Sequence, residues 1–225
     1  MELELLKKLS EVDGVSGREK DVRKIMEEEL LKSVKKEDIS YDNIGSIIAK
    51  NGNFGPRIML AGHMDEIGML VTKITDEGYL KFQTIGGWWD QVLLSQQMTI
   101  TTTDGKKYHG VIGSKPPHIL SEEERKNVYK IDDMFVDLGV KNREEVEKLG
   151  IRIGDMITPA IDFKVMANED ILLGKAWDNR IGCAVVLEVM KAFKDQEHPN
   201  TIYGVGTVQE EVGCRGAKTS SNLIN

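Results

Sequence analysis

Two apolar segments of this sequence each run directly into a short stretch of charged and histidine side chains. RIMLA (57–61) is followed by GHMDE (62–66), and TIYGVGTV (201–208) is followed by QEE (209–211). An apolar run without alternation is typical of a strand buried on both faces of a sheet with parallel strands. Ligands collect at the carboxyl ends of such strands. The two segments therefore predict an α/β sheet with a ligand site at the ends of its strands.

Composition restricts the class of protein further. The 225 residues are 40% hydrophobic and 30% charged, which is typical of a folded protein, and the net charge is −7. A negative charge without a basic stripe argues against a nucleic-acid partner. No apolar run reaches membrane-spanning length, and MELELLKKLSEVDG at the amino end is not a signal peptide. We therefore expect a cytoplasmic protein with no nucleic-acid and no membrane partner.

The two cysteines, Cys183 and Cys214, do not form a C-x-x-C pair. They are expected to be reduced thiols, which fits a cytoplasmic protein, and a single disulfide between them is the alternative.

The segment before the first strands predicts a helix. Ser16-Gly-Arg-Glu19 has the pattern of a capping box, in which the first and fourth side chains bond to the backbone at the start of a helix. The apolar residues that follow recur at helical spacing and form one stripe: Val22, Ile25, Met26 and Leu30.

Residues from about 67 to 165 have a different pattern. Short apolar strands alternate with Asp-Glu-Gly and Asp-Gly turns, and helical signals are few. This pattern predicts a small β-barrel or sandwich inserted into the α/β domain. Beyond it, a strand near 171–176, a helix that begins at Asp178 and the strand at 201–208 predict a parallel βαβ unit.

Side chains at the predicted strand ends could bind metal ions. His63 and Asp65 are two residues apart, so on an extended segment they face the same side, and Asp65 can fix which ring nitrogen faces a metal. Asp178 could bridge two cations, or it could cap the helix that follows it. Glu210 and Glu211 point in different directions, so one can ligate a metal while the other transfers a proton. A solvated loop is the alternative for this pair.

Three separated segments resemble one family. GHMDEIG (62–68), GKAWDNRIGC (174–183) and VQEEVGCRGA (208–217) are similar to motifs of the TET-type, cellulase-M-like glutamyl aminopeptidases, a family of dinuclear metallo-exopeptidases. IGGWWDQ (85–91) and GVIGSKPPH (110–118) also resemble segments of the domain inserted in that family. The resemblance covers essentially the whole chain.

The resemblance implies a metal-dependent aminopeptidase that removes N-terminal residues from short peptides through metal-activated water. It implies that His63, Asp178 and Glu211 ligate two divalent ions (zinc, cobalt or manganese), with Asp178 as the bridge. Asp65 would orient His63, and Glu210 would be the general base.

The implied fold is a metallo-exopeptidase-like α/β sandwich with an inserted β-barrel domain. Residues 1–66 and 166–225 would form the catalytic domain, and residues 67–165 would form a β-rich dimerisation domain. Dimers of this family join into larger homo-oligomers, dodecamers at full length. Members also continue past the QEE motif with two more ligands, an Asp and a His, so we expect this chain to be C-terminally truncated and to have weaker peptidase activity than a full-length version.

Two other functions compete with an aminopeptidase. A cellulase-like glycosidase would use Glu210 and Glu211 as its two carboxylates and would need no metal. An inactive fragment could act only in assembly through the β-rich insert, where Trp88 and Trp89 are candidates for an interface or for the core.

Overall fold

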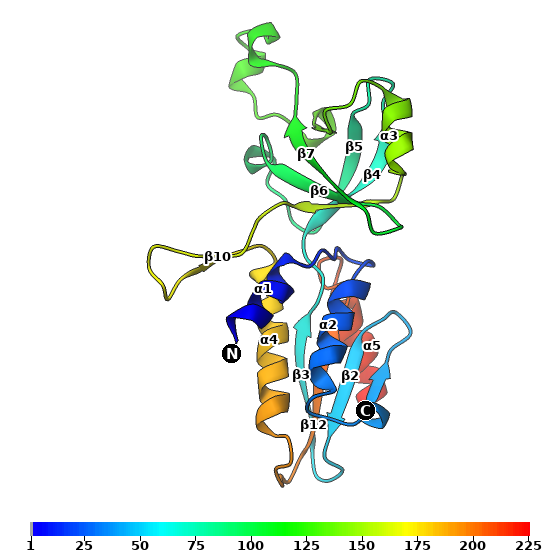
Figure 1. Ribbon diagram of the computed structural model, residues 1–225, viewed down its shortest axis with the longest axis vertical. Coiled ribbons are helices and arrows are strands. Elements are labelled where there is room, and N and C mark those ends of the chain that lie inside the picture. Colours follow the sequence, from blue (N-terminus) through cyan, green and yellow to red (C-terminus); the bar gives the residue numbers. More distant parts are fainter. Residues whose placement is uncertain (1) are drawn as a thin grey trace. The chain divides into compact units, whose positions relative to one another are not determined.

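A computed structural model describes residues 2–225 of the chain (Figure 1). The chain divides into two compact units, one formed by the residues up to Glu66 together with Asp162–Asn225, and the other by Ile67–Ile161. The second unit ends four residues before the predicted boundary at 165, because Phe163 already packs against the core of the first unit. Each unit has a hydrophobic core of its own.

A mixed sheet forms the centre of the first unit. Its strands lie in the order β1-β2-β12-β3, with the bounds β1 Ile39–Tyr41, β2 Ile47–Asn51, β12 Thr201–Thr207 and β3 Arg57–His63. β12 runs parallel to β3 and antiparallel to β2, and Thr207 is paired with His63. The two chain segments that follow β3 and β12 therefore leave the sheet at the same end.

Helices cover both faces of this sheet. They are α1 Leu3–Glu11, α2 Lys20–Leu30, α4 Trp177–Ala192 and α5 Arg215–Ile224. Side chains of α1, α2 and α4 share one buried cluster with Ile47 and Ala49 of β2, whereas Ile224 of α5 packs with Ile48 in another. Successive residues of a strand point to opposite faces, so this alternation places the helices in two layers. The predicted α/β architecture is confirmed.

The second unit is a closed six-stranded barrel, as predicted. Its strands are β4 Gly68–Ile74, β5 Leu80–Ile85, β8 Phe135–Asp137, β7 Lys107–Gly113, β6 Gln97–Thr101 and β9 Met156–Pro159, in that order around the barrel. A helix, α3 Arg143–Leu149, begins where Asn142 accepts a hydrogen bond from the Glu145 N–H and ends at Gly150 in the left-handed region. Both ends are standard helix caps.

Short elements complete the chain. β10 Lys164–Val165 and β11 Leu172–Leu173 form a two-stranded ribbon. The 3₁₀ turns are η1 Lys36–Asp38, η2 Asp90–Val92, η3 Pro117–Ile119, η4 Glu124–Lys126 and η5 Ile131–Asp133. None of the helices within residues 2–225 combines the length and the apolar character that crossing a bilayer requires.

Three local predictions were wrong. β11 pairs with β10 and not with β12, so the expected βαβ unit does not form, and the parallel neighbour of β12 is β3. RIMLA is not buried on both faces, because β3 is an edge strand of the sheet that residues 2–225 form and Ile58 is exposed. Ser16 and Glu19 make no capping box. Helix α2 begins at Lys20, and its start has no side-chain cap.

A glycine sets how closely α4 packs on β3. A Cβ built on Gly62 would lie 2.5 Å from the backbone nitrogen of Cys183 and 2.5 Å from the carbonyl carbon of Gly182. Backbone atoms cannot move aside as a flexible side chain can. The helix therefore approaches the strand directly beside His63 only because residue 62 has no side chain.

We predict that Gly62→Ala lowers the free energy of unfolding by about 1–3 kcal/mol, because a methyl group forced against backbone overpacks the interface. Chemical denaturation followed by circular dichroism measures the change. Gly87→Ala is the control, since a Cβ there has no heavy atom within 4 Å. Equal stability of Gly62→Ala and the wild type would contradict the close contact.

Candidate metal centre

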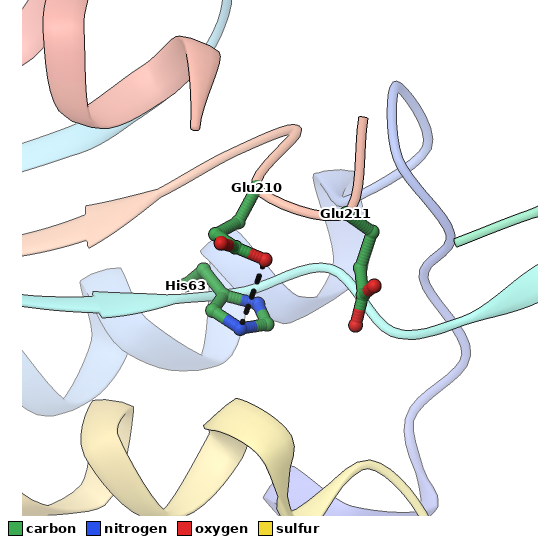
Figure 2. A group of neighbouring side chains, drawn as sticks. All are labelled: His63, Glu210 and Glu211. Carbon is green, nitrogen blue, oxygen red and sulfur yellow. Dashed lines mark ion pairs between the residues drawn. The ribbon is translucent and has the colours of Figure 1, made fainter. Parts of the chain in front are cut away.

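The candidate site lies where β3 and β12 end. His63 is the last residue of β3, and the Met64 N–H donates to the carbonyl oxygen of Thr207, so the loop after β12 runs beside the loop after β3. Glu210 and Glu211 belong to that second loop (Figure 2).

The predicted side chains converge on the His63 ring. Nε2 of His63 lies 3.0 Å from Oδ1 of Asp178 and 3.6 Å from Oε2 of Glu210. One ligand atom from each of His63, Glu210 and Glu211 lies within 4.8 Å of the others. Figure 2 shows Glu210 reaching over the ring, while Glu211 descends beside it from the next position in the loop. The structure thus brings together residues from segments that are far apart in the sequence.

Asp178 reaches His63 from the start of α4. The residue that precedes this helix is Ala176, and Asp178 itself has non-helical backbone angles. Its side chain is 88% exposed although it bonds to the buried imidazole. Asp178 is therefore not the helix cap that the sequence offered as an alternative, and its carboxylate is open to ions from solvent.

The surroundings of His63 favour its charged form. Burial lowers the pKa of the imidazole, but hydrogen bonding to Asp65 and the charges of Asp65 and Glu210 outweigh it and raise the pKa to about 9. Nδ1 lies 3.0 Å from the carbonyl oxygen of Asp65, which can only accept, so Nδ1 carries a proton. Nε2 carries the second proton of this charged form and faces the carboxylates of Asp178 and Glu210. A cation bound at Nε2 would replace that proton.

Asp65 does more than orient His63. Its carboxylate lies 3.5 Å from Nδ1, but it accepts shorter bonds from the Glu210 N–H at 3.0 Å, the Glu211 N–H at 3.1 Å and the Ser16 hydroxyl at 2.5 Å. Burial raises the pKa of Asp65, and the bonds to His63, Ser16 and the two N–H groups lower it by more, so the net shift is downward. Asp65 is therefore an anion that holds the loop after β12.

The donor set fits a divalent cation. Burial and the charges of Asp65, Glu210 and Asp178 raise the pKa of Glu211 against the opposing effect of His63. A cation would relieve this repulsion among carboxylates. One imidazole nitrogen with carboxylate oxygens is a ligand set that suits zinc, cobalt or manganese.

A buried ion network that the sequence reading missed lies beneath the site. Nζ of Lys175 lies 2.6 Å from Oδ1 of Asp13 and 2.7 Å from Oε1 of Glu66, and all three side chains are almost completely buried. Glu66 also accepts the Gly14 N–H at 3.1 Å. The network connects the end of α1, the loop after β3 and the segment before α4.

Arg180 completes this support. Its fully buried guanidinium donates to the carbonyl oxygens of Met64 at 2.6 Å, Leu9 at 2.6 Å and Val12 at 3.0 Å. Met64 directly follows His63, so Arg180 fixes the backbone beside the site. The sequence signal was available, since Glu66, Lys175 and Arg180 are charged residues within the GHMDEIG and GKAWDNRIGC segments.

Comparison with known proteins gives the family. The M42 glutamyl aminopeptidase family matches residues 45–225, and a second family, AMPT, matches residues 1–26. This chain belongs to the M42 family. The matched region contains all five predicted site residues, His63, Asp65, Asp178, Glu210 and Glu211.

Relatives of this M42 chain cover nearly its whole length. FrvX of Escherichia coli (strain K12) is 47% identical over 100% of the chain, and the glutamyl aminopeptidase of Lactococcus lactis subsp. cremoris is 36% identical over 98%. The chain spans 62% of the length of each of these proteins.

Solved structures agree with the fold. The TET aminopeptidase of the marine archaeon Thaumarchaeota archaeon SCGC AB-539-E09 superposes with a TM-score of 0.94 at 46% identity, over 99% of this chain and 63% of that one. The TET1 peptidase of Pyrococcus horikoshii, which assembles into a tetrahedron or a large octahedral shell, gives 0.85 at 36% identity, over 98% of this chain and 64% of that one. The family predicted from the three motifs is confirmed.

We predict that Lys175→Met lowers the free energy of unfolding of this M42 chain by about 3–5 kcal/mol, because it removes the buried cation nearest to Asp13 and Glu66 and leaves Glu66 the longer contact with Arg180 at 3.6 Å. Urea denaturation measures the loss. Lys32→Met is the matched control, since Lys32 also pairs with a glutamate, Glu29 at 2.6 Å, but on the surface. A similar stability loss in both variants would contradict the role of the buried network.

The two thiols should differ in reactivity. Both cysteines are free. Cys183 is buried, and burial raises the pKa of its thiol to about 12, whereas Cys214 is exposed and its pKa is raised by a hydrogen bond to Glu210. We predict that a disulfide reagent modifies one thiol in the native protein and two after unfolding, and that Cys214→Ser removes the native reaction. Two reactive thiols before unfolding would refute this.

Proposed function

We propose that this chain is the site-bearing part of a metal-dependent aminopeptidase that removes N-terminal residues from short peptides. The observation that carries the proposal is the convergence of His63, Asp178, Glu210 and Glu211 at the ends of two parallel strands in a chain of the M42 family.

Two divalent ions, zinc, cobalt or manganese, are the proposed cofactors. His63, Asp178 and Glu211 would hold them, with Asp178 as the bridge, since its carboxylate is open to solvent while one oxygen already touches the ring of His63. When bound, the ions would activate the attacking water and polarise the scissile carbonyl.

Glu210 is the proposed general base. Its carboxylate is partly exposed and lies beside the His63 ring, where it can take a proton from the attacking water and pass it to the leaving amine. Asp65 holds Glu210 in this place through the backbone N–H of Glu210, and it keeps a proton on Nδ1 of His63 so that Nε2 faces the ions.

The proposed partners are short peptides and further copies of the chain. The assembly of the TET1 peptidase of Pyrococcus horikoshii supports a homo-oligomer, built from dimers that use the barrel unit and extending to a dodecamer in a full-length protein. The proposed location is the cytoplasm, without a membrane or nucleic-acid partner.

A glycosidase is the weaker alternative. It would place two carboxylates on either side of a sugar bond and would need no metal. In this structure Glu210 and Glu211 instead gather with His63 around one point, which supports ion binding. Hydrolysis of aminoacyl-nitroanilides that stops after exhaustive chelation and returns with zinc or cobalt would favour the peptidase. Activity on a polysaccharide that survives chelation would favour the alternative.

We predict that Glu210→Gln keeps its bound metal and loses about 10²–10⁴-fold in kcat, because the variant cannot accept a proton. Glu211→Ala should lose bound metal first. Elemental analysis and nitroanilide hydrolysis measure the two effects, with the exposed Glu197→Gln as the control. Wild-type turnover by Glu210→Gln would exclude Glu210 as the base.

A further inference from the structure

We infer that Ser16 and Glu19 are positioning residues of the proposed metal centre, which hold the loop 209–211 so that Glu210 and Glu211 face His63. The inference rests on the proposed function for its metal readout. It assigns a role to two residues whose pattern predicted only a helix cap.

Three successive N–H groups of this loop point at carboxylates. The Gln209 N–H donates to Oε1 of Glu19 at 2.9 Å, the Glu210 N–H to Oδ1 of Asp65 at 3.0 Å, and the Glu211 N–H to Oδ2 of Asp65 at 3.1 Å. The N–H groups of Glu210 and Glu211 thus share the carboxylate of Asp65, while that of Gln209 has the carboxylate of Glu19. The direction of the Glu210 and Glu211 side chains is therefore set by two buried carboxylates.

Gln209 needs such an anchor. Its φ is 57°, in the left-handed region that residues other than glycine seldom adopt. This turn separates the end of β12 from the two glutamates. A strained residue persists only where its surroundings hold it. The Gln209 N–H donates to Glu19, and the backbone N–H and guanidinium of Arg215 donate to the carbonyl and side-chain oxygens of Gln209.

Glu19 is placed for this task by its own segment. Its side chain is buried, and Oε1 also accepts the Gly17 N–H at 2.8 Å. Oε1 therefore links the segment before α2 to the loop after β12. A surface cap at the start of α2 would not need burial. Burial raises the pKa of this carboxyl group, which is the cost of the arrangement.

Ser16 acts on the second of these carboxylates, that of Asp65. Its hydroxyl donates to Oδ2 of Asp65, the same oxygen that accepts the Glu211 N–H. The neighbouring backbone fixes this approach, since Val15 forms a parallel bridge with Glu66, whose N–H donates to the Gly14 carbonyl at 3.0 Å. Loss of the hydroxyl would free Asp65 to turn away from the loop.

The test uses paired variants of the protein. Glu19→Ala removes the acceptor, whereas Glu19→Gln keeps an oxygen at the same position. Ser16→Ala removes the hydroxyl, whereas Ser16→Thr keeps it. Asp155→Ala is the matched control, because Asp155 is an equally buried carboxylate that accepts the Arg152 N–H and the Thr103 hydroxyl within the barrel unit.

The first readout is amide hydrogen exchange of the metal-free protein. Glu19→Ala and Ser16→Ala should exchange faster in a peptide that covers 208–213, with no change in a peptide that covers Ile47–Asn51 of β2. The second readout is zinc affinity, measured by competition with a chromophoric chelator. Both alanine variants should bind zinc about 10-fold more weakly, as is usual when a residue behind a metal ligand is lost. The Gln and Thr variants should restore both properties.

The outcomes separate the two hypotheses. Zinc affinity and loop exchange that stay at the wild-type level in Glu19→Ala and Ser16→Ala overturn the positioning role. An equal change of both properties in Asp155→Ala overturns it as well. A wild-type protein that binds no zinc and hydrolyses no aminoacyl-nitroanilide overturns the proposed function. In that case, faster exchange confined to 208–213 in Glu19→Ala and Ser16→Ala still supports the inference that these two residues position the loop. Unchanged exchange overturns that inference.

Discussion

The candidate site depends on one buried anion, the carboxylate of Asp65. A carboxylate removed from water is tolerated only when hydrogen bonds or charges replace its hydration. Asp65 finds these partners in the His63 ring, the Ser16 hydroxyl and the backbone of Glu210 and Glu211. Because one side chain satisfies its needs from three segments, it also determines how those segments lie relative to one another.

The buried ion network of Lys175, Asp13 and Glu66 differs from the candidate site in its charge balance. Lys175 lies against Asp13 and Glu66, and Arg180 lies 3.6 Å from Glu66, so two buried cations balance two buried carboxylates. Arg180 also donates to three carbonyl oxygens of the backbone nearby. The candidate site instead keeps the carboxylates of Asp178, Glu210 and Glu211 close together, so that they repel one another and favour a cation. Charge is thus balanced where the fold needs rigidity and left unbalanced where the site faces solvent.

Much of the site was predictable because strands can be recognised from short local runs of apolar residues. The apolar runs before His63 and Glu210 predict strands whose carboxyl ends meet, and the structure pairs Thr207 with His63. The Asp-Gly turns between 67 and 165 likewise predicted a small barrel or sandwich, and the resemblance to the family favoured the barrel. The same local reading failed for Ser16 and Glu19, because a capping box and a pair of site-positioning side chains have the same sequence, and only burial against Asp65 and Gln209 distinguishes them.

By itself the sequence determined the family, through its three motifs, and a β-rich insert and the candidate side chains at the strand ends, through the order of apolar runs, turns and charged residues. Tertiary structure alone decided which strand lies beside which, that β3 is an edge strand in the described sheet, and that Lys175 neutralises Asp13. The reason is physical. Local patterns record which face of a segment is buried, whereas the partner of a buried charge depends on which distant segments the folded chain brings into contact.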